Sequence, residues 1–326
     1  MGLDLDSLDT TVELARHNAA EPGYIPLFTA LAGVAVSVGH PAHERMVARY
    51  RGVRAAGRSR MGGDDGDGAV LAALQDGLQL AFLFDPAVDV VAEIEHFIAW
   101  WRSLESRALA RPAVDPGHPI RFPPTSDTSS TLLRSAAEAF AARGFYATSV
   151  ASIARSAGVS KSTLLHHYGS KNDLLIAVLT ELDELLAGGV EPASLTPAVR
   201  IRRFSESVVP AEWRESEGSV LVEPAEAYVV LLSEATAPEH PGHGWFVDRI
   251  AEIRASLGRD IEALRQDDGG RQSDAPNEDP AQIGAARSAL WLIAIRDGLR
   301  VQWLYDCSLS AREALDSIRI ALVGAE

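Results

Sequence analysis

Lysine is almost absent from this chain of 326 residues: Lys161 and Lys171 are its only two, and both lie within the stretch 158–175. The chain carries a formal charge of −15 at neutral pH. Such an acidic balance argues against a protein that coats nucleic acid over its whole surface. It does not exclude one local basic site, and the clustering of both lysines needs a local explanation.

Cysteine, aromatic residues and long apolar runs are also scarce. Cys307 is the one cysteine, so a disulfide within the chain is impossible, which fits a reducing cytoplasm. The acidic N-terminus has no secretory signal pattern. The longest strongly apolar run, 289–295, is far shorter than the roughly 20 residues that a membrane-spanning helix needs. Aromatics make up only 6% of the residues while alanine and leucine are abundant, so the sequence predicts an all-α cytoplasmic protein.

The sign of the charge reverses in the middle of the chain. Residues 131–176 contain five basic and two acidic side chains, a net charge of +3, so the remainder carries −18. One short segment therefore differs from everything around it.

Two copies of one pattern frame this segment. The motif HPxH at 40–43 returns at 240–243, and DGLQLAFLFD at 76–85 is matched by DGLRVQWLYD at 297–306. Each copy also has an apolar stretch before HPxH and a polar, glycine-rich loop between the two motifs. Four matched features in one order predict a duplicated domain.

Helical spacing in the basic segment predicts short helices joined by a tight turn. Residues 131–144 are expected to form a helix that Gly144 ends, and Thr148 is expected to cap a second helix. Gly158 lies in the turn, and Ser160 caps a third helix. Two short helices joined in this way are a helix-turn-helix.

The third helix explains the placement of the lysines. Leu164 and Tyr168 are expected to face the core, which leaves polar residues on the other faces: Lys161, Ser162, Thr163, His166 and His167. These donors suit phosphates and base edges in a major groove. Lys171 begins the following helix after the cap Ser170, where free backbone N–H groups also favour a phosphate.

The stretch AAEAFAARGFYATSVASIARSAGVSKSTLLHHYGSKNDLLIAVL, 136–179, closely resembles the N-terminal DNA-binding region of the TetR family of bacterial transcriptional repressors. The resemblance implies a homodimer, a small-molecule pocket in an all-helical regulatory domain, and release from DNA when ligand binds. By matching positions, phosphate contacts are expected from Thr148, Lys161, Thr163 and Lys171, and base contacts from Lys161, Ser162 and His166. The full expected DNA-binding set is Thr148, Ser149, Ser160, Lys161, Ser162, Thr163, His166, His167 and Lys171.

The chain departs from the family pattern at several positions. Leu165 and His167 stand where the family usually has tyrosines, and Ser162 stands where glycine is common. Ala151 stands where an acidic residue would complete a capping box with Thr148.

The order of segments departs further. We expect a TetR-like C-terminal regulatory domain at 1–106, a Pro-rich linker at 107–130, the DNA-binding domain at 131–178, and a second regulatory and dimerisation domain at 179–326. This is the order expected of a tandem fusion that lacks its first DNA-binding head. The copies are expected either to pair within one chain, near Leu78 and Leu299, or to leave pairing to two chains.

The other groups of candidate residues give weaker indications of function. Candidate ligand-binding residues in the second copy are Tyr228, Leu231, Leu232, Trp291, Ile295 and Trp303. No metal site or cofactor is expected, because the HPxH histidines lack further ligands and are expected to act in local capping and packing. The acidic glycine-rich loop 62–68 lacks the glutamate of a calcium loop.

The sequence as a whole predicts a DNA-binding regulator, expected to be a repressor, that a small molecule releases from double-stranded DNA. No short catalytic motif occurs, so an enzyme is not expected. The alternative is a ligand-sensing or protein-sequestering module that binds DNA weakly because one head is missing.

Overall fold

The computed structural model describes residues 7–104, 127–187, 195–209, 224–269 and 283–324. These residues form fourteen helices and no strand, which confirms the all-α prediction. The helices are α1 (Leu8–Ala20), α2 (Tyr24–Val34), α3 (His43–Met61), α4 (Asp65–Phe84), α5 (Val90–Ser103), α6 (Thr128–Ala147), α7 (Val150–Ser156), α8 (Lys161–Tyr168), α9 (Lys171–Ala187), α10 (Pro197–Glu206), α11 (Pro224–Glu234), α12 (His243–Gly269), α13 (Ala285–Tyr305) and α14 (Ala311–Val323). Among the described residues, no helix combines the length and the hydropathy of a membrane span.

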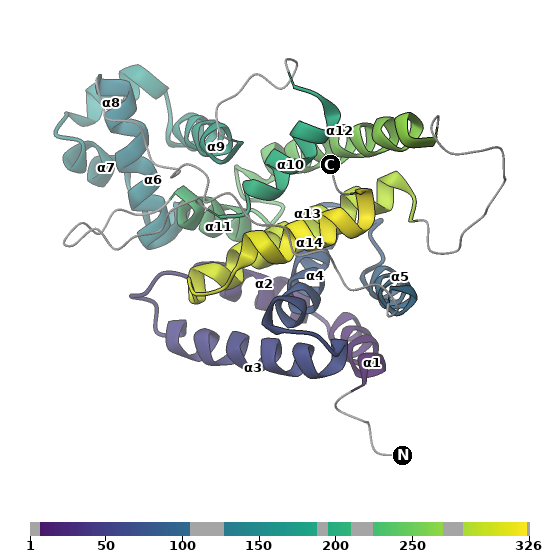
Figure 1. Ribbon diagram of the computed structural model, residues 1–326. Helices are drawn as coiled ribbons and strands as arrows, with labels where there is room; N and C mark the ends of the chain where they lie inside the picture. Colours follow the sequence, from purple (N-terminus) through teal and green to yellow (C-terminus); the bar gives the residue numbers. More distant parts are fainter. Residues whose placement is uncertain (1–6, 105–126, 188–194, 210–223, 270–282, 325–326) are drawn as a thin grey trace.

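The molecule has a head and a body (Figure 1). Helices α6 to α8 and the start of α9 form the head, at the upper left of the view, and the remaining helices form the body around α4 and α13. A large hydrophobic core surrounds α4 and α13 in the body, a smaller one lies between α2, α3, α11 and the end of α13, and another core joins the head to α11. The head therefore rests on the body through α11 and the continuous helix α9.

Two predicted boundaries are wrong. The linker predicted at 107–130 lies outside the described residues except at its end, where Asp127 caps α6 and the helix begins at Thr128. The loop predicted at 62–68 ends early, because Asp64 caps α4: its carboxylate accepts the N–H of Asp67, whose own carboxylate accepts the N–H of Asp64. This capping box uses the acidic residues of the loop to start a helix.

Helices α4 and α13 cross with their backbones in contact. A Cβ atom added at Gly77 would lie 1.9 Å from the carbonyl oxygen of Ala294, and one added at Gly298 would lie 2.2 Å from that of Ala73. Gly77 and Gly298 hold the same place in the two DGL stretches, and each alanine lies four residues before its own glycine. The contacts are thus reciprocal, and only glycine permits this approach.

Ion pairs at the two ends of the crossing repeat the same relation. Arg54 on α3 pairs with Asp306, and Arg254 Nη1 on α12 lies 3.2 Å from Asp85 Oδ2. Each arginine lies eleven residues after the second histidine of an HPxH motif, and the aspartates end the two DGL stretches. Each ion pair therefore joins an arginine that follows one HPxH motif to the aspartate that ends the more distant DGL stretch.

The HPxH motifs adopt one conformation and make one kind of contact. His40 Nδ1 and His240 Nδ1 each accept the backbone N–H two residues later, at 3.2 and 3.1 Å. Nδ1 of His43 and of His243 lies 3.0 and 2.8 Å from the carbonyl oxygen eight residues earlier. These are the local capping and packing contacts expected of the motif.

The second histidine of each HPxH motif also contacts an aromatic ring of the more distant DGL stretch. His43 lies against Tyr305 and His243 against Phe84, both with ring centroids 5.5 Å apart. Tyr305 and Phe84 are equivalent residues of the DGL stretches.

Candidate nucleic-acid interface

Three serines set the geometry of the head. Ser149 caps α7 and forms a capping box with Ser152; Ser160 accepts the N–H of Thr163 at 3.0 Å to start α8; and Ser170 accepts the N–H of Asp173 at 3.1 Å to start α9. Gly158, with φ of +71°, makes the turn between α7 and α8. The caps predicted at Ser160 and Ser170 are confirmed, and the two helices have the arrangement of a helix-turn-helix.

Helix α8 is held by its inner face. Leu164 is fully buried, and the hydroxyl of Tyr168 lies 2.7 Å from Ser129 Oγ at the start of α6. The outward face is polar, because Lys161, Ser162, His166 and His167 are all exposed. A recognition helix needs this division between a packed face and a donor-rich face.

The N-terminal turn of α8 gathers hydroxyl groups. Ser160 Oγ lies 2.8 Å from both Ser162 Oγ and Thr163 Oγ1. The neighbouring ammonium of Lys161 has no hydrogen-bond or ionic partner among the described residues. This turn therefore presents one uncommitted cation beside a cluster of hydroxyl donors, in a position that suits base edges and phosphates.

Thr148 does not belong to this surface, and its predicted cap is wrong. Its side chain is 2% exposed, and its hydroxyl donates to the carbonyl oxygens of Ala139 at 3.0 Å and Gly144 at 2.7 Å. The backbone of Gly144 has φ of +74°, which bends the end of α6 back toward this hydroxyl. The N-cap of α7 is therefore one residue further on, at Ser149, and Thr148 stabilises the end of α6 instead.

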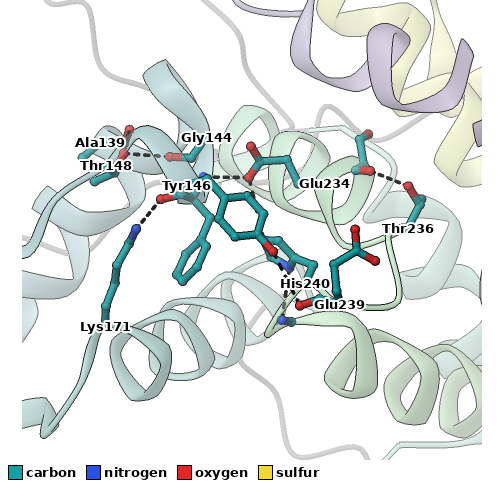
Figure 2. A network of polar contacts seen from close by, with 12 residues as sticks. Ala139, Gly144, Tyr146, Thr148, Lys171, Glu234, Thr236, Glu239 and His240 are labelled. Carbon is teal, nitrogen blue, oxygen red and sulfur yellow. Dashed lines mark hydrogen bonds and ion pairs between the residues drawn. The ribbon is translucent and has the colours of Figure 1, made fainter. Parts of the chain in front are cut away.

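Lys171 is engaged between the head and the body. Its ammonium donates to the carbonyl oxygen of Phe145 at 2.6 Å and lies 4.0 Å from the centroid of that ring (Figure 2). Burial lowers its pKa, although the nearby Glu234 carboxylate acts in the opposite direction. The sequence predicted that this lysine contacts a phosphate, whereas in the structure its ammonium lies at the junction between the head and the body.

Glu234 of α11 completes the junction. Its Oε2 atom accepts the backbone N–H of Phe145 at 2.6 Å (Figure 2). Burial raises the pKa of this carboxyl, while the Phe145 N–H and Lys171 act to lower it. His240 stacks edge-on against Phe145 and Tyr146, and burial lowers the pKa of His240 to about 4. One acid of the body thus holds the bent end of α6.

Arg155 is a further candidate for contact with DNA, and it was not among the residues predicted from the sequence. It is exposed near the end of α7, and its guanidinium has no partner among the described residues. The first helix of such a motif crosses the DNA backbone, so a cation at this end suits a phosphate. The signal was present in the sequence, because Arg155 is one of the five cations of the basic segment.

The predicted ligand-binding residues are scattered. Tyr228 lines a cavity of about 170 Å³ in the body, together with side chains from α9, α10, α12 and α13. Leu232 lines a separate, smaller cavity between α2, α4, α11 and α13. The others are buried in the hydrophobic cores: Leu231, Trp291, Ile295 and Trp303.

Comparison with known proteins identifies the central segment. Residues 132–178 match the model of bacterial regulatory proteins of the tetR family. A stretch of 104 residues is 36% identical to the HTH-type transcriptional activator FasR of Mycolicibacterium smegmatis. That alignment covers 32% of this chain and 47% of FasR, so the chain spans about half the length of this curated relative.

Solved structures were also matched to part of this chain. A TetR-like transcriptional regulator from Rhodococcus sp. RHA1 is 20% identical, with a TM-score of 0.39, over 61% of this chain and 95% of that chain. AibR, in complex with isovaleryl coenzyme A and operator DNA, is 20% identical, with a TM-score of 0.41, over 61% and 100%. The TetR family regulator PfmR from Thermus thermophilus is 26% identical, with a TM-score of 0.38, over 60% and 98%.

Proposed function

Residues 132–178 form an internal helix-turn-helix domain of the tetR family, a family of transcriptional regulators and not of enzymes, and from this premise we propose that the chain regulates transcription by binding double-stranded DNA. The observation that carries the proposal is the outward face of α8. It presents Lys161, Ser162 and His166 to solvent while Leu164 anchors the helix beneath them. In this proposal α8 enters the major groove.

The contacts divide by chemistry. Lys161, Ser162 and His166 face base edges, and Lys161 also reaches a phosphate. Further phosphate contacts come from Ser149, Ser160, Thr163, His167 and Arg155. Thr148 is not among them, because its hydroxyl is committed inside the head.

Control by a ligand has a route through two helices. Helix α9 begins at Lys171 in the head, and Asp183 and Leu186 near its other end line the cavity of the body. Helix α11 carries Tyr228 at the same cavity and Glu234 at the end of α6. A ligand that favours one position of these helices would therefore shift the head between two populations.

We further propose that the two flanking units are copies of one domain, paired with each other within the chain. The reciprocal glycine contacts, the reciprocal ion pairs and the reciprocal ring contacts support this. In an interface with two-fold symmetry, residue i of one unit contacts j of the other, and j contacts i. The glycine contacts of the α4–α13 crossing have this character.

Pairing within the chain leaves one helix-turn-helix on each paired body. Regulators with two heads read two half-sites about 34 Å apart. This chain would instead read a single half-site of about one helical turn or less. Fewer phosphates would be neutralised, so the dependence of affinity on salt would be shallow.

The test is selection of bound sequences from a library of random duplexes, with the mass of the complex measured in parallel. We expect an unrepeated half-site and one chain per duplex. Lys161→Gln should cost about 1–3 kcal/mol of binding free energy and lower the salt slope by about one. Arg202→Gln, which removes an exposed cation of α10, is the matched control.

Other outcomes would separate the candidate functions. A palindromic consensus with two chains per duplex would refute pairing within the chain. Retention of every duplex by Lys161→Gln at unchanged affinity would refute the role of α8. Binding of no duplex by a folded chain would favour the alternative, a ligand-sensing or protein-sequestering module. Repression remains our proposal for the sign of regulation, but FasR is named an activator, so a transcription assay must score both directions.

A further inference from the structure

The cavity lined by Tyr228 is unusual for the number of arginines around it. It has a volume of about 170 Å³ and lies between the end of α9 and helices α10 to α13. Five arginines line it, on three helices: Arg200, Arg203, Arg249, Arg296 and Arg300. In a chain with a net charge of −15, such a concentration of guanidinium groups points to an anion.

Three of these arginines are held by acceptors of the protein. Arg200 is paired with Asp260 on α12. Arg296 donates to Asp297 at 2.9 Å, and Arg300 donates to the carbonyl oxygens of residues 208 and 207 at 3.0 and 2.6 Å. Their guanidinium groups form a rigid, charged wall.

The other two arginines retain donors. Arg203 is half-buried, and its guanidinium has no partner among the described residues. Arg249 pairs through its terminal nitrogens with Asp183 and Glu252, each at 2.8 Å, but its Nε atom is buried without an acceptor. Because an unpaired buried donor is costly, these groups mark the place where an acceptor is missing.

The charges around the cavity do not cancel. Five arginines face four carboxylates at the cavity or paired with its arginines, namely Asp183, Glu252, Asp260 and Asp297, which leaves an excess of one positive charge. Arg300 is fully buried beside Arg296, and burial lowers its pKa to about 10, with the charge of Arg296 adding to the effect. The wall is therefore both desolvated and electropositive.

Two of the corresponding positions of the first unit carry no charge, although Arg49 stands where the second unit has Arg249. Aligned on the DGL stretches, Gln75 and Gln79 stand where the second unit has Arg296 and Arg300. Both units keep the glycine of the helix crossing, so the pairing contacts are common to both, but the arginines of α13 are not. The charged cavity belongs to the unit that carries the head, as a ligand site coupled to the head requires.

The walls between the guanidinium groups are apolar. Leu186, Leu195, Phe204 and Ile253 face the cavity, and Tyr228 closes one side. A cavity of about 150 Å³ holds a benzene molecule. We propose that this cavity binds a small organic anion, a carboxylate or a phosphate ester with a short apolar body, whose acidic group is held by Arg203 and Arg249.

This inference rests on the proposed function, because the anion would act as the effector of the DNA-binding head. Its acidic group would join Arg203 of α10 to Arg249 of α12, and its apolar body would contact Leu186 of α9 and Tyr228 of α11. Those last two helices are the ones that reach the head. Binding and release of the anion would thus bias the position of the head.

The experiment is calorimetric titration of the full chain, without DNA, with hexanoate, hexyl phosphate and hexan-1-ol. At least one of the two anions should bind about tenfold or more tightly than the alcohol. Arg203→Gln should lose that preference, whereas Arg203→Lys should retain part of it. Arg202→Gln, its exposed neighbour on α10, should bind as the wild type does. Thermal melting of each variant establishes that it is folded, and comparison of the two anions separates a carboxylate from a phosphate ligand.

Three results would overturn the inference: no probe binds, the alcohol binds as tightly as both anions, or Arg203→Gln and Arg202→Gln lose affinity equally. DNA binding is measured on the same samples. Anion binding that leaves DNA affinity unchanged would refute the coupling but keep the site, and DNA binding without anion binding would refute the site but keep the proposed function.

Discussion

The crossing of α4 and α13 gives the sharpest prediction about the body. In Gly298→Ala, the new Cβ atom would start 2.2 Å from the carbonyl oxygen of Ala73, whereas such contacts are essentially never closer than 3.0 Å. The obstructing atom belongs to the backbone and cannot rotate aside as a side chain could, so the two helices must move apart. Overpacking of this kind costs about 1–3 kcal/mol. The higher helix propensity of alanine offsets at most about 1 kcal/mol of this cost.

A matched control lies on a neighbouring helix. Gly258 is inside α12, and a Cβ added there would have its nearest neighbour outside that helix, the Cα of Ala286, at 4.0 Å. Gly258→Ala should therefore gain about 0.5–1 kcal/mol from helix propensity alone. Gly77→Ala, the reciprocal change, should behave like Gly298→Ala, because its Cβ would start 1.9 Å from the oxygen of Ala294.

Chemical denaturation measures the free energy of unfolding of the three variants. We expect Gly298→Ala and Gly77→Ala to be destabilised and Gly258→Ala to be stabilised, with the chain monomeric by mass in every case. If Gly298→Ala were as stable as Gly258→Ala, the close backbone contact would be absent in solution. If the wild-type chain were a dimer by mass, the same contacts could join two chains, and pairing within one chain would be refuted.

Three further predictions concern the head and its junction. Thr148→Val should cost about 1–2 kcal/mol of stability, because two backbone acceptors lose their donor, while the folded variant binds DNA with unchanged affinity. Glu234→Ala should cost about 1–3 kcal/mol and speed amide exchange at Phe145, whose N–H loses its acceptor. Acid should destabilise the contacts between the head and the body. The pKa of His240 is about 4 in the folded chain, against 6.5 ordinarily, so between these pH values the unfolded chain binds a proton that the folded chain does not. The free energy of unfolding should therefore fall as the pH is lowered from 6.5 to 4, by at most about 3 kcal/mol. His240→Asn should flatten that decline, and a slope equal to that of the wild type would contradict it.

Local pattern was enough to predict the helix-turn-helix. The caps at Ser160 and Ser170 and the buried Leu164 are confirmed, because each depends on residues within one turn of helix. The cap predicted at Thr148 is wrong for a physical reason. Two hydroxyl residues stand side by side, and the positive φ of Gly144 decides which of them faces inward.

The arginine cavity could not be predicted from local pattern. Its cations come from α10, α12 and α13, which lie far apart in the sequence, and each arginine taken alone reads as an ordinary surface charge. The glycines of the DGL stretches were visible, but glycine inside an apolar helix first suggests a weak helix. Only the packing of Gly77 and Gly298 against another backbone shows why they stand there.

The proposed pairing within one chain would change what a ligand can do. A tether holds the two units together at roughly millimolar effective concentration, so the body would not come apart on dilution. The proposed arrangement would lack a second head, whose linked binding can add a factor of about 10² to 10⁴ in affinity. In a two-headed regulator a ligand can act by changing the spacing between heads. With a single head there would be no spacing to change, and control by a ligand would have to act on the orientation or order of α8 itself. Lys171 and Glu234, which hold the bent end of α6 from two sides, are the contacts through which α9 and α11 could exert that control.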